Sequence, residues 1–478
     1  MFRSIIYKYK NTSIIAKATL WFTIATVFQK GINFITVPIF TRLMNPDEYG
    51  IYSIYISWFA VISIFTSLKL DGSVFNKSMS KFKKDRNGYI ASIQIETTII
   101  TILFYLLFLI FNEFVVKLTS LNFFLISLMF IQMITQPAYN FWMLRKRYEY
   151  NYKSFLIVVI LTAIINTILG ICFVYYIPND KGTVRIISYV VVQSLVGLVL
   201  YLTNLFKGLK SIKWEYISYS TKFNLPLIPH YISQYILDQL DKIMIQKMCG
   251  FAYAAIYSVS YNISMILKII SDSLISALTP WYYEKLEKKD FISIKKIYKK
   301  LFICLLIMLS FFILISPEIF KFILPKTYYD GIYALPPICM SIVFLFMYSL
   351  FSLIEFYYEA NKFSMFTSSI GAVLNFVLNY IFIKKFGFIA AGYTTLFCYM
   401  VFAVCHFEYS SIIIYKREKE YIYNRKWIYF CILFSTLIAC VSPILFKFVI
   451  LRIVILILIL VLMFINRKQI LKLLKKHN

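Results

Sequence analysis

The residues of this chain that could do chemistry are ionisable side chains placed inside long apolar stretches. Lys30 lies deep within the apolar stretch 14–40 and has no acidic residue near it in that stretch. In the stretch 223–247, the spacing of His230, Gln234 and Asp241 places them on one face of an α-helix. Asp238 and Lys242 form an i, i+4 pair beside that face. A charge in hydrocarbon costs about 2.5–3.5 kcal/mol unless it meets a partner or a water-filled cavity, so these side chains indicate a polar site.

Two later stretches carry further polar stripes. Lys268 and Asp272 are spaced to pair in the stretch 253–275, and Glu355 follows Ser352 on one face of the stretch 332–357. Cations in such places suit an anionic ligand, whereas carboxylates suit coupling to H⁺ or Na⁺. We therefore predict a cationic binding cleft and a set of coupling or gating groups. The cleft residues are Lys30, Lys268, Lys242 and Arg42, and the coupling or gating residues are Asp241, Asp238, His230 and Glu355.

Each of these groups also has a plainer structural interpretation. The pairs Asp238–Lys242 and Lys268–Asp272 neutralise themselves without any ligand. Glu355 lies near the end of its stretch, where its carboxylate would reach the membrane surface by snorkelling. Arg42 suits an interface anchor as well as a phosphate contact, and His230 suits a packing residue as well as a titrating one. The sequence leaves these alternatives open.

The elements that must position these residues are about fourteen apolar stretches, most of them long enough for an α-helix to cross the hydrocarbon core. A water-soluble core could not use so much apolar surface, because 60% of the residues are hydrophobic and the mean hydropathy is +0.73. We therefore predict an all-α integral membrane protein with about fourteen transmembrane helices. The stretches are 14–40, 50–68, 89–110, 122–144, 154–176, 186–206, 223–247, 253–275, 301–316, 332–357, 364–383, 388–414, 428–446 and 448–465.

The charge distribution predicts the orientation of these helices. Most of the 50 Lys and Arg residues fall in alternate breaks between stretches, which places both termini on the cytoplasmic side. The net charge of +28 is then a topology signal, and nucleic-acid binding is not expected. No break is long enough for a soluble catalytic domain, and the chain has no GxxxxGK phosphate loop. We expect no enzymatic activity and no cofactor, with coupling to H⁺ or Na⁺ as the remaining role for small ions.

Two sequence matches indicate an internal duplication. Segment 42–53 matches segment 247–258 with Ile-Tyr-Ser at equivalent positions, and segment 164–169 matches segment 373–378 around Asn166 and Asn375. Both matches pair helices of the same predicted orientation. They predict two six-helix lobes related by a pseudo-twofold axis along the membrane normal, as in parallel transporter repeats. The predicted lobes are 1–206 and 223–414, joined by a cytoplasmic linker, 207–222. Residues 415–478 hold a cytoplasmic loop, two C-terminal helices and a basic tail.

The segment Pro38 to Tyr52 reads Pro-Ile-Phe-Thr-Arg-Leu-Met-Asn-Pro-Asp-Glu-Tyr-Gly-Ile-Tyr. It resembles the signature of bacterial polysaccharide flippases of the O-antigen or capsule type, within the multidrug/oligosaccharidyl-lipid/polysaccharide exporter (MOP) superfamily. The second half resembles the family too, through Leu225 to Pro229 and through Asp241-Lys242. The family usually carries Asp-Arg at the latter position, so Lys242 is a conservative departure.

The resemblance implies a flippase that moves a lipid-linked oligosaccharide, carried on undecaprenyl diphosphate, from the cytoplasmic to the outer leaflet by alternating access. It places the protein in the bacterial cytoplasmic membrane, in contact with membrane lipid and beside the polymerase and glycosyltransferases of the same pathway. One alternative is a multidrug or cation exporter of the same fold, which the lysines disfavour. The other is a membrane glycosyltransferase or polymerase, which Asp47-Glu48 suggests and the short outside loops disfavour.

Overall fold

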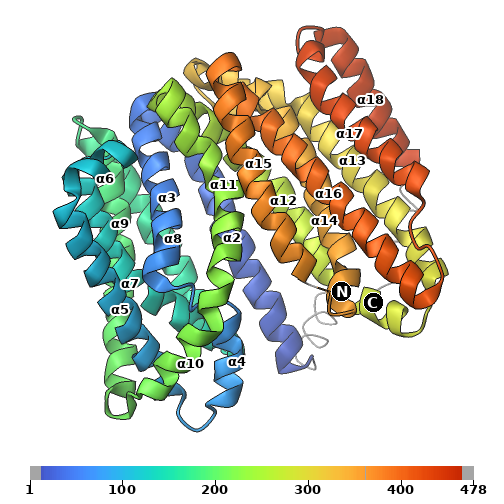
Figure 1. Cartoon of the computed structure of the whole chain (residues 1–478). Helices are drawn as coiled ribbons and strands as arrows, with labels where there is room; N and C mark the ends of the chain where they lie inside the picture. The colour runs from blue at the N-terminus through green and yellow to red at the C-terminus, as the bar shows by residue number, and fades with distance from the viewer. Residues whose placement is uncertain (1–11, 361, 466–478) are drawn as a thin grey trace. The chain divides into compact units, whose positions relative to one another are not determined.

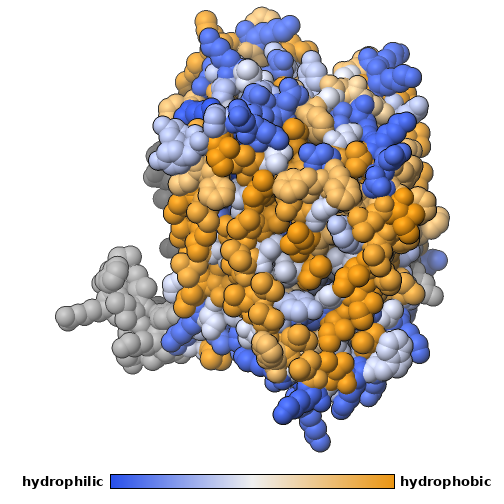
Figure 2. Space-filling model, turned by 90° about the vertical axis from the view of Figure 1, so that its left-hand side faces the viewer, coloured by the Kyte–Doolittle hydropathy of each residue, from blue (hydrophilic) through white to orange (hydrophobic). Residues whose placement is uncertain are grey.

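The computed structural model describes residues 12–360 and 362–465, and within these residues every regular element is a helix. Eleven of the described helices, or twelve if one bent pair counts as one span, are long and apolar enough to cross a membrane. On the face drawn in Figure 2, hydrophobic residues form a broad band, and hydrophilic residues gather above and below it. These features confirm the prediction of an all-α multi-pass membrane protein.

The predicted number of fourteen spans is not established by length and composition. Each of the fourteen predicted stretches coincides with a helix, but two of these helices fall outside the apolar set. Helix α11 (Ile228–Cys249) is too polar because it carries His230, Asp238, Asp241 and Lys242. The apolar part of α18 (Val449–Ile465) is short, at Val449–Val461. The count of fourteen stays a prediction.

By the contacts between helices, the chain divides into two compact units, residues 1–255 and 256–478. In the first unit, α9 packs against α3, α5, α7 and α8, and α11 packs against α3 (Figure 1). The unit contains α2 (Ile14–Leu43), α3 (Pro46–Ser67), α4 (Ser73–Lys81), α5 (Arg86–Ile110), α6 (Asn112–Thr119), α7 (Phe123–Tyr148), α8 (Tyr152–Tyr176), α9 (Lys181–Gly208), the 3₁₀ turn η1 (Leu209–Ser211), α10 (Trp214–Asn224), η2 (Leu225–Leu227) and α11.

One end of the first unit has an aromatic core beneath α4 and α10. Phe75 of α4 stacks on Phe141 of α7 at 5.7 Å between ring centroids, and Tyr216 of α10 meets Tyr89 of α5 at 6.0 Å. The segment 207–222, predicted as a cytoplasmic linker, is largely helical and packs against α4 and α5. This core fixes α10 against α5, which the functional argument below uses.

The second unit is built around α14 (Leu335–Tyr357). Of its most apolar segment, 83% is buried, because it packs against α13, α16 and α17. The unit holds most of α12 (Phe251–Glu287), together with α13 (Phe291–Ile323), the 3₁₀ segment η3 (Lys326–Tyr333), α14, α15 (Lys362–Phe386), α16 (Ile389–Glu418), α17 (Arg425–Leu445) and α18.

The predicted end of the ninth stretch at Ser316 is wrong. Helix α13 continues through Pro317 to Ile323. A proline removes one backbone hydrogen bond, but membrane helices tolerate it because neighbouring groups satisfy the freed carbonyl. Here Ser316 is fully buried, and its hydroxyl donates to the carbonyl of Ile313 at 2.7 Å.

Two local contacts agree with the predicted duplication. Asn166 of α8 accepts from Arg185 of α9 at 3.1 Å, and the matching Asn375 of α15 donates to Thr395 of α16 at 3.2 Å. Each asparagine is thus buried against the following helix of its own unit. The relation of the lobes by a pseudo-twofold axis, and their boundaries at 1–206 and 223–414, stay predictions.

The start of α3 is fixed by a capping box. The Asn45 side chain accepts from the Glu48 amide at 2.9 Å, and the Glu48 carboxylate accepts from the Asn45 amide at 2.9 Å. We expect Asn45→Ala to lower the free energy of unfolding by about 1 kcal/mol, because one helix-end amide loses its acceptor. Unfolding in mixed micelles, followed by tryptophan fluorescence, measures this loss. Asn112→Ala, at the start of the exposed α6, is the control and should change stability less.

Candidate functional site

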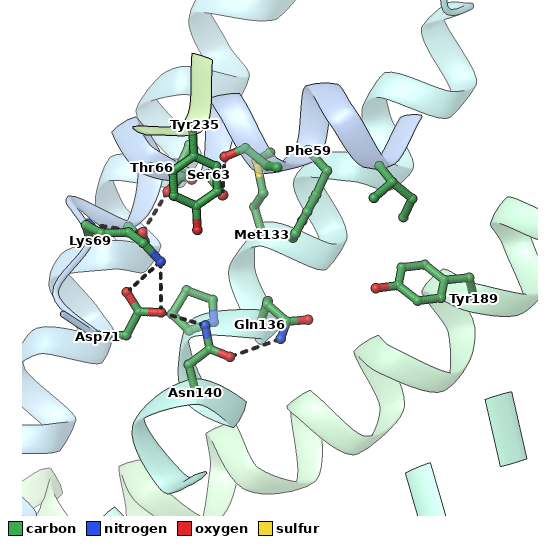
Figure 3. Close-up of a pocket in the computed structure, with 14 residues that line it drawn as sticks. Phe59, Ser63, Thr66, Lys69, Asp71, Met133, Gln136, Asn140, Tyr189 and Tyr235 are labelled. Atoms are coloured by element: carbon green, nitrogen blue, oxygen red, sulfur yellow. Dashed lines mark hydrogen bonds and ion pairs between the residues drawn. The ribbon is translucent and has the colours of Figure 1, made fainter. Parts of the chain in front are cut away.

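A polar pocket of about 290 Å³ lies inside the first unit (Figure 3). Its wall comes from α3, the turn after α3, α7, α9 and α11. Charged, amide, hydroxyl and aromatic side chains all face it. Its polar and aromatic lining residues are Phe59, Ser63, Thr66, Ser67, Lys69, Asp71, Gln136, Asn140, Tyr189 and Tyr235.

One end of the pocket is an ordered network around Lys69. The Lys69 ammonium lies 3.2 Å from Oδ1 of Asp71. The Asn140 amide donates to Oδ2 of the same carboxylate at 2.8 Å, and the Gln136 amide donates to Asn140 at 3.1 Å. Tyr235 of α11 presents its ring 5.4 Å from the ammonium. Figure 3 shows these groups pointing toward one another across the pocket.

The backbone that presents Lys69 is strained. Leu68 and Lys69 both have left-handed conformations, with φ of 47° and 52°, which for non-glycine residues cost on the order of 1 kcal/mol each. The turn persists because it is fixed from outside. The fully buried Asn224, at the end of α10, donates a hydrogen bond from its amide to the Leu68 carbonyl. Strain held in this way is typical of a functional site.

Lys69 is cationic in this setting. Burial lowers the pKa of Lys69, but the neighbouring Asp71 carboxylate and Tyr235 outweigh burial and raise the pKa above its usual value. The ammonium therefore keeps its positive charge beside Asp71.

A second cation, Arg185, is buried in the first unit next to the pocket. Its side chain is 6% exposed, and its guanidinium lies 4.3 Å from the centre of the Phe40 ring and 5.0 Å from that of Tyr52. It donates to Asn166 and to Ser188, whereas its Nε has no hydrogen-bond partner among the described residues. No carboxylate of the described chain pairs with it. Tyr189, one turn further along α9, links this cation to the pocket wall.

None of the predicted residues of the first unit is part of the lining of this pocket. Lys30 is half-buried on α2, and Arg42 is exposed near the end of the same helix. On α11, Asp241 and Lys242 are 3% and 8% exposed, so neither faces lipid. Lys242 donates to Gln239 at 3.2 Å, and Ser57 of α3 donates to the same oxygen at 3.1 Å.

The remaining predicted residues differ in their exposure. His230 and Asp238 of α11 are half-buried, as is Lys268 of α12, whereas Asp272 is exposed. None of the eight predicted cleft, coupling or gating residues lines the polar pocket. The cationic cleft that they were predicted to form stays a prediction.

The interpretation that the Glu355 carboxylate snorkels to the membrane surface is wrong. Its side chain is 0% exposed, and its Oε1 lies 2.7 Å from Nδ1 of His406, which is also fully buried. The other ring nitrogen, Nε2, lies 3.0 Å from the Thr367 hydroxyl. Sequence reasoning missed His406 because its partner is in another helix and no local spacing indicates the pair.

The second unit also contains an apolar groove of about 400 Å³ between α13, α17 and α18. Its lining is almost wholly hydrocarbon, including Leu306, Phe434, Leu437 and Ile459. Such a groove suits a flexible hydrocarbon chain and offers nothing to a sugar or a phosphate.

Comparisons with known proteins identify the family and the fold. The sequence profile of the polysaccharide biosynthesis protein family matches residues 15–284, more than half of the chain, and the MatE profile matches residues 226–381. The chain is 22% identical over 319 residues to Lsg locus putative protein 1 of Haemophilus influenzae, covering 65% of this chain and 74% of that protein.

Solved structures share the fold. The chain is similar to an inward-facing multidrug resistance MATE family transporter of the MOP superfamily, with a TM-score of 0.62 at 13% identity over 84% of this chain and 99% of the other. It is also similar to the lipid II flippase MurJ in an inward closed conformation, with a TM-score of 0.60 at 14% identity over 91% of this chain and 100% of the other. The chain therefore belongs to the polysaccharide biosynthesis protein family, on the fold of the MOP superfamily, as the motif resemblance predicted.

Proposed function

We propose that this protein is a flippase that moves an undecaprenyl-diphosphate-linked oligosaccharide from the cytoplasmic to the outer leaflet of the bacterial cytoplasmic membrane. The single observation that carries the proposal is the polar pocket, where Lys69 lies among hydrogen-bonding amides and aromatic rings. Amides and aromatic faces suit a glycan, and a cation suits a phosphate. The family match supports a role in polysaccharide biosynthesis, and we infer from the motif resemblance that the polysaccharide is of the O-antigen or capsule type.

The charge arrangement favours an anionic substrate over a cationic drug. The carboxylate that lines the pocket, Asp71, is matched by Lys69 and accepts from Asn140, so the pocket has no surplus negative charge for an organic cation. Arg185 adds a second positive charge beside the pocket and lacks a carboxylate partner among the described residues. A phosphate about 4 Å from one such cation gains about 4 kcal/mol at an effective dielectric near 20, before desolvation.

The acidic pair that suggested an enzyme has structural partners. Glu48 closes the capping box of α3, and Asp47 accepts from the Ala252 amide at 3.1 Å. Helix starts favour acidic residues for this reason. These contacts remove the specific support for a glycosyltransferase or polymerase, and the protein needs no catalytic group of its own.

A mechanism without ATP follows from the charge of the substrate. In the predicted topology, with both termini cytoplasmic, the turn that holds Lys69 lies at the cytoplasmic end of α3. The lipid-linked precursor is made on that side of the membrane. In this proposal the diphosphate enters there. Moving two negative charges outward across an inside-negative potential releases about 2.3 kcal/mol per charge per 100 mV. Glycosyltransferases and a polymerase of the same pathway would supply and consume the substrate.

Purified protein in liposomes tests the function directly. A fluorescent oligosaccharide on undecaprenyl diphosphate is placed in both leaflets, and a membrane-impermeant glycosidase then digests what is exposed outside. Protein-containing liposomes should lose nearly all of the label, whereas empty liposomes should retain the inner half. Liposomes that leave the inner half intact but accumulate ethidium would identify a cation exporter and refute the proposal.

The predicted cationic cleft gives a second test in the same assay. Lys30 has no hydrogen bond or ion pair with another residue of the described chain, so we expect Lys30→Ala to slow flipping and Lys30→Arg to retain more of it. Lys268→Ala should also slow flipping. Restoration by Lys268→Ala with Asp272→Ala would show instead that Lys268 only neutralises Asp272.

A further inference from the structure

Glu96 is a buried carboxyl group without a counter-ion. It lies within α5, its side chain is 6% exposed, and its Oε1 is hydrogen-bonded to the Thr221 hydroxyl of α10. Its Oε2 has no hydrogen-bond partner among the described residues. An ionised carboxylate in this setting would be strongly disfavoured, because burial removes water and a single hydroxyl contact replaces it.

The hydrogen bonds around Thr221 indicate where the proton is. The Thr221 hydroxyl lies within hydrogen-bonding distance of two oxygens, Oε1 of Glu96 and, at 2.9 Å, the backbone carbonyl of Ile217. A hydroxyl has one proton to donate. Both contacts are satisfied when Thr221 donates to the carbonyl and a protonated Glu96 donates to Thr221. The geometry therefore points to a neutral Glu96 in this state.

The ionisable groups on the elements around Glu96 have other partners. Tyr89, on α5 itself, is bonded to Ser220 of α10 at 3.0 Å. No described residue brings a cation within ion-pair distance of Glu96. The groups on the neighbouring elements, each with its partner, are Tyr201 of α9 with Thr98, Arg145 of α7 with Glu149 and Asn87, Tyr216 of α10 with Asp85, and Lys69 after α3 with Asp71.

Thr221 connects this carboxyl group to the pocket. Asn224 follows Thr221 by three residues on α10, so the two side chains lie on the same side of the helix. The Asn224 amide holds the Leu68 carbonyl, and Lys69 is the next residue. Any movement of α10 that follows a change at Glu96 is therefore passed to the strained turn that presents Lys69 to the pocket.

We propose that Glu96 is a proton-binding site whose proton exchanges with the anionic substrate at Lys69. The inference rests on the proposed function. When the proton is bound, α10 pins the turn and Lys69 stays on Asp71, as seen here. Loss of the proton leaves a carboxylate that takes the Thr221 hydrogen bond from Ile217, which shifts α10 and frees Lys69 for a phosphate. One proton leaves to the cytoplasmic side as the substrate binds and one returns from outside after its release, so proton entry drives export.

The proton site itself is tested without any substrate. Infrared difference spectra of the purified protein, recorded across a pH series, should contain the C=O band of a protonated carboxyl group that disappears as the pH rises. Glu96→Gln should remove this band, whereas Glu113→Gln, on the exposed face of α6, should leave it in place. A band that persists in Glu96→Gln would overturn the assignment.

The exchange is tested with undecaprenyl diphosphate in detergent micelles. Wild-type protein should release about one proton per bound lipid into a weakly buffered solution below the titration midpoint. Its affinity should rise about tenfold per pH unit there and level off above it. Glu96→Gln, permanently neutral, should bind weakly at every pH and release none. Thr221→Val should keep the infrared band but lose the pH dependence of binding, and Thr221→Ser should retain both.

Two results would overturn the exchange in different ways. Wild-type pH dependence and proton release in Glu96→Gln would place the coupling elsewhere while leaving the flippase intact. Failure of wild-type protein to bind undecaprenyl diphosphate at any pH would refute the proposed function, and with it the exchange, even if the infrared band confirms that Glu96 carries a proton.

Discussion

Lys69→Met is expected to slow flipping of the lipid-linked oligosaccharide about 100-fold, which corresponds to about 2.7 kcal/mol of lost substrate stabilisation. The reason is that the pocket loses its cation, and the remaining amides bind a diphosphate far more weakly. Lys69→Arg should retain most of the activity because charge is the requirement. The protein should still insert, since Lys69 follows the last turn of α3 and lies outside that apolar helix.

A companion variant separates substrate contact from simple neutralisation. Lys69→Met with Asp71→Asn leaves no unpaired carboxylate, and the amide introduced by the second substitution can still bond Asn140. If Lys69 serves the substrate, the double variant stays as slow as Lys69→Met. Recovery of flipping to the wild-type rate would show that Lys69 only balances Asp71, and the pocket would lose its assigned role. Lys84→Met, an exposed lysine after α4, is the matched control and should flip normally.

Whether the sequence could predict a residue of this site depends on the position of that residue relative to the apolar stretches. Lys69 directly follows the predicted stretch 50–68, and Arg185 directly precedes 186–206, so a hydropathy pattern assigns both to loops. Their burial comes from residues far away in sequence, Asn140 and Tyr235 for Lys69 and Phe40 and Tyr52 for Arg185. The available local signal was the nearby pair of opposite charges, Lys69 and Asp71, just before Gly72.

The helices themselves could be predicted because hydrophobic length is a local property. Apolar stretches of sufficient length form helices in a membrane regardless of their neighbours. Partners across helices are set by packing, which no single-sequence periodicity contains. Asp241 could be predicted to avoid lipid because its place on a polar helix face is a local property of the sequence. The pairing of Glu355 with His406 could not be predicted, because it depends on packing between two helices.

His406→Leu is expected to cost about 3 kcal/mol of stability, because it leaves Glu355 fully buried with neither oxygen bonded to a partner in the described chain. Removing one member of a buried pair is costly, whereas neutralising both members is often close to neutral. Glu355→Gln with His406→Leu should therefore recover most of the loss. Unfolding in mixed micelles measures both variants, and His230→Leu, on the half-buried start of α11, is the control.

The same pair distinguishes a structural from a coupling role. Glu355→Gln retains a side chain that can hydrogen-bond His406, so its stability should stay close to that of the wild type. If Glu355 takes part in coupling, as predicted from the sequence, this stable variant should flip substrate slowly and respond less to an imposed pH gradient. Normal flipping with a normal gradient response would restrict the Glu355–His406 pair to holding α14 against α16.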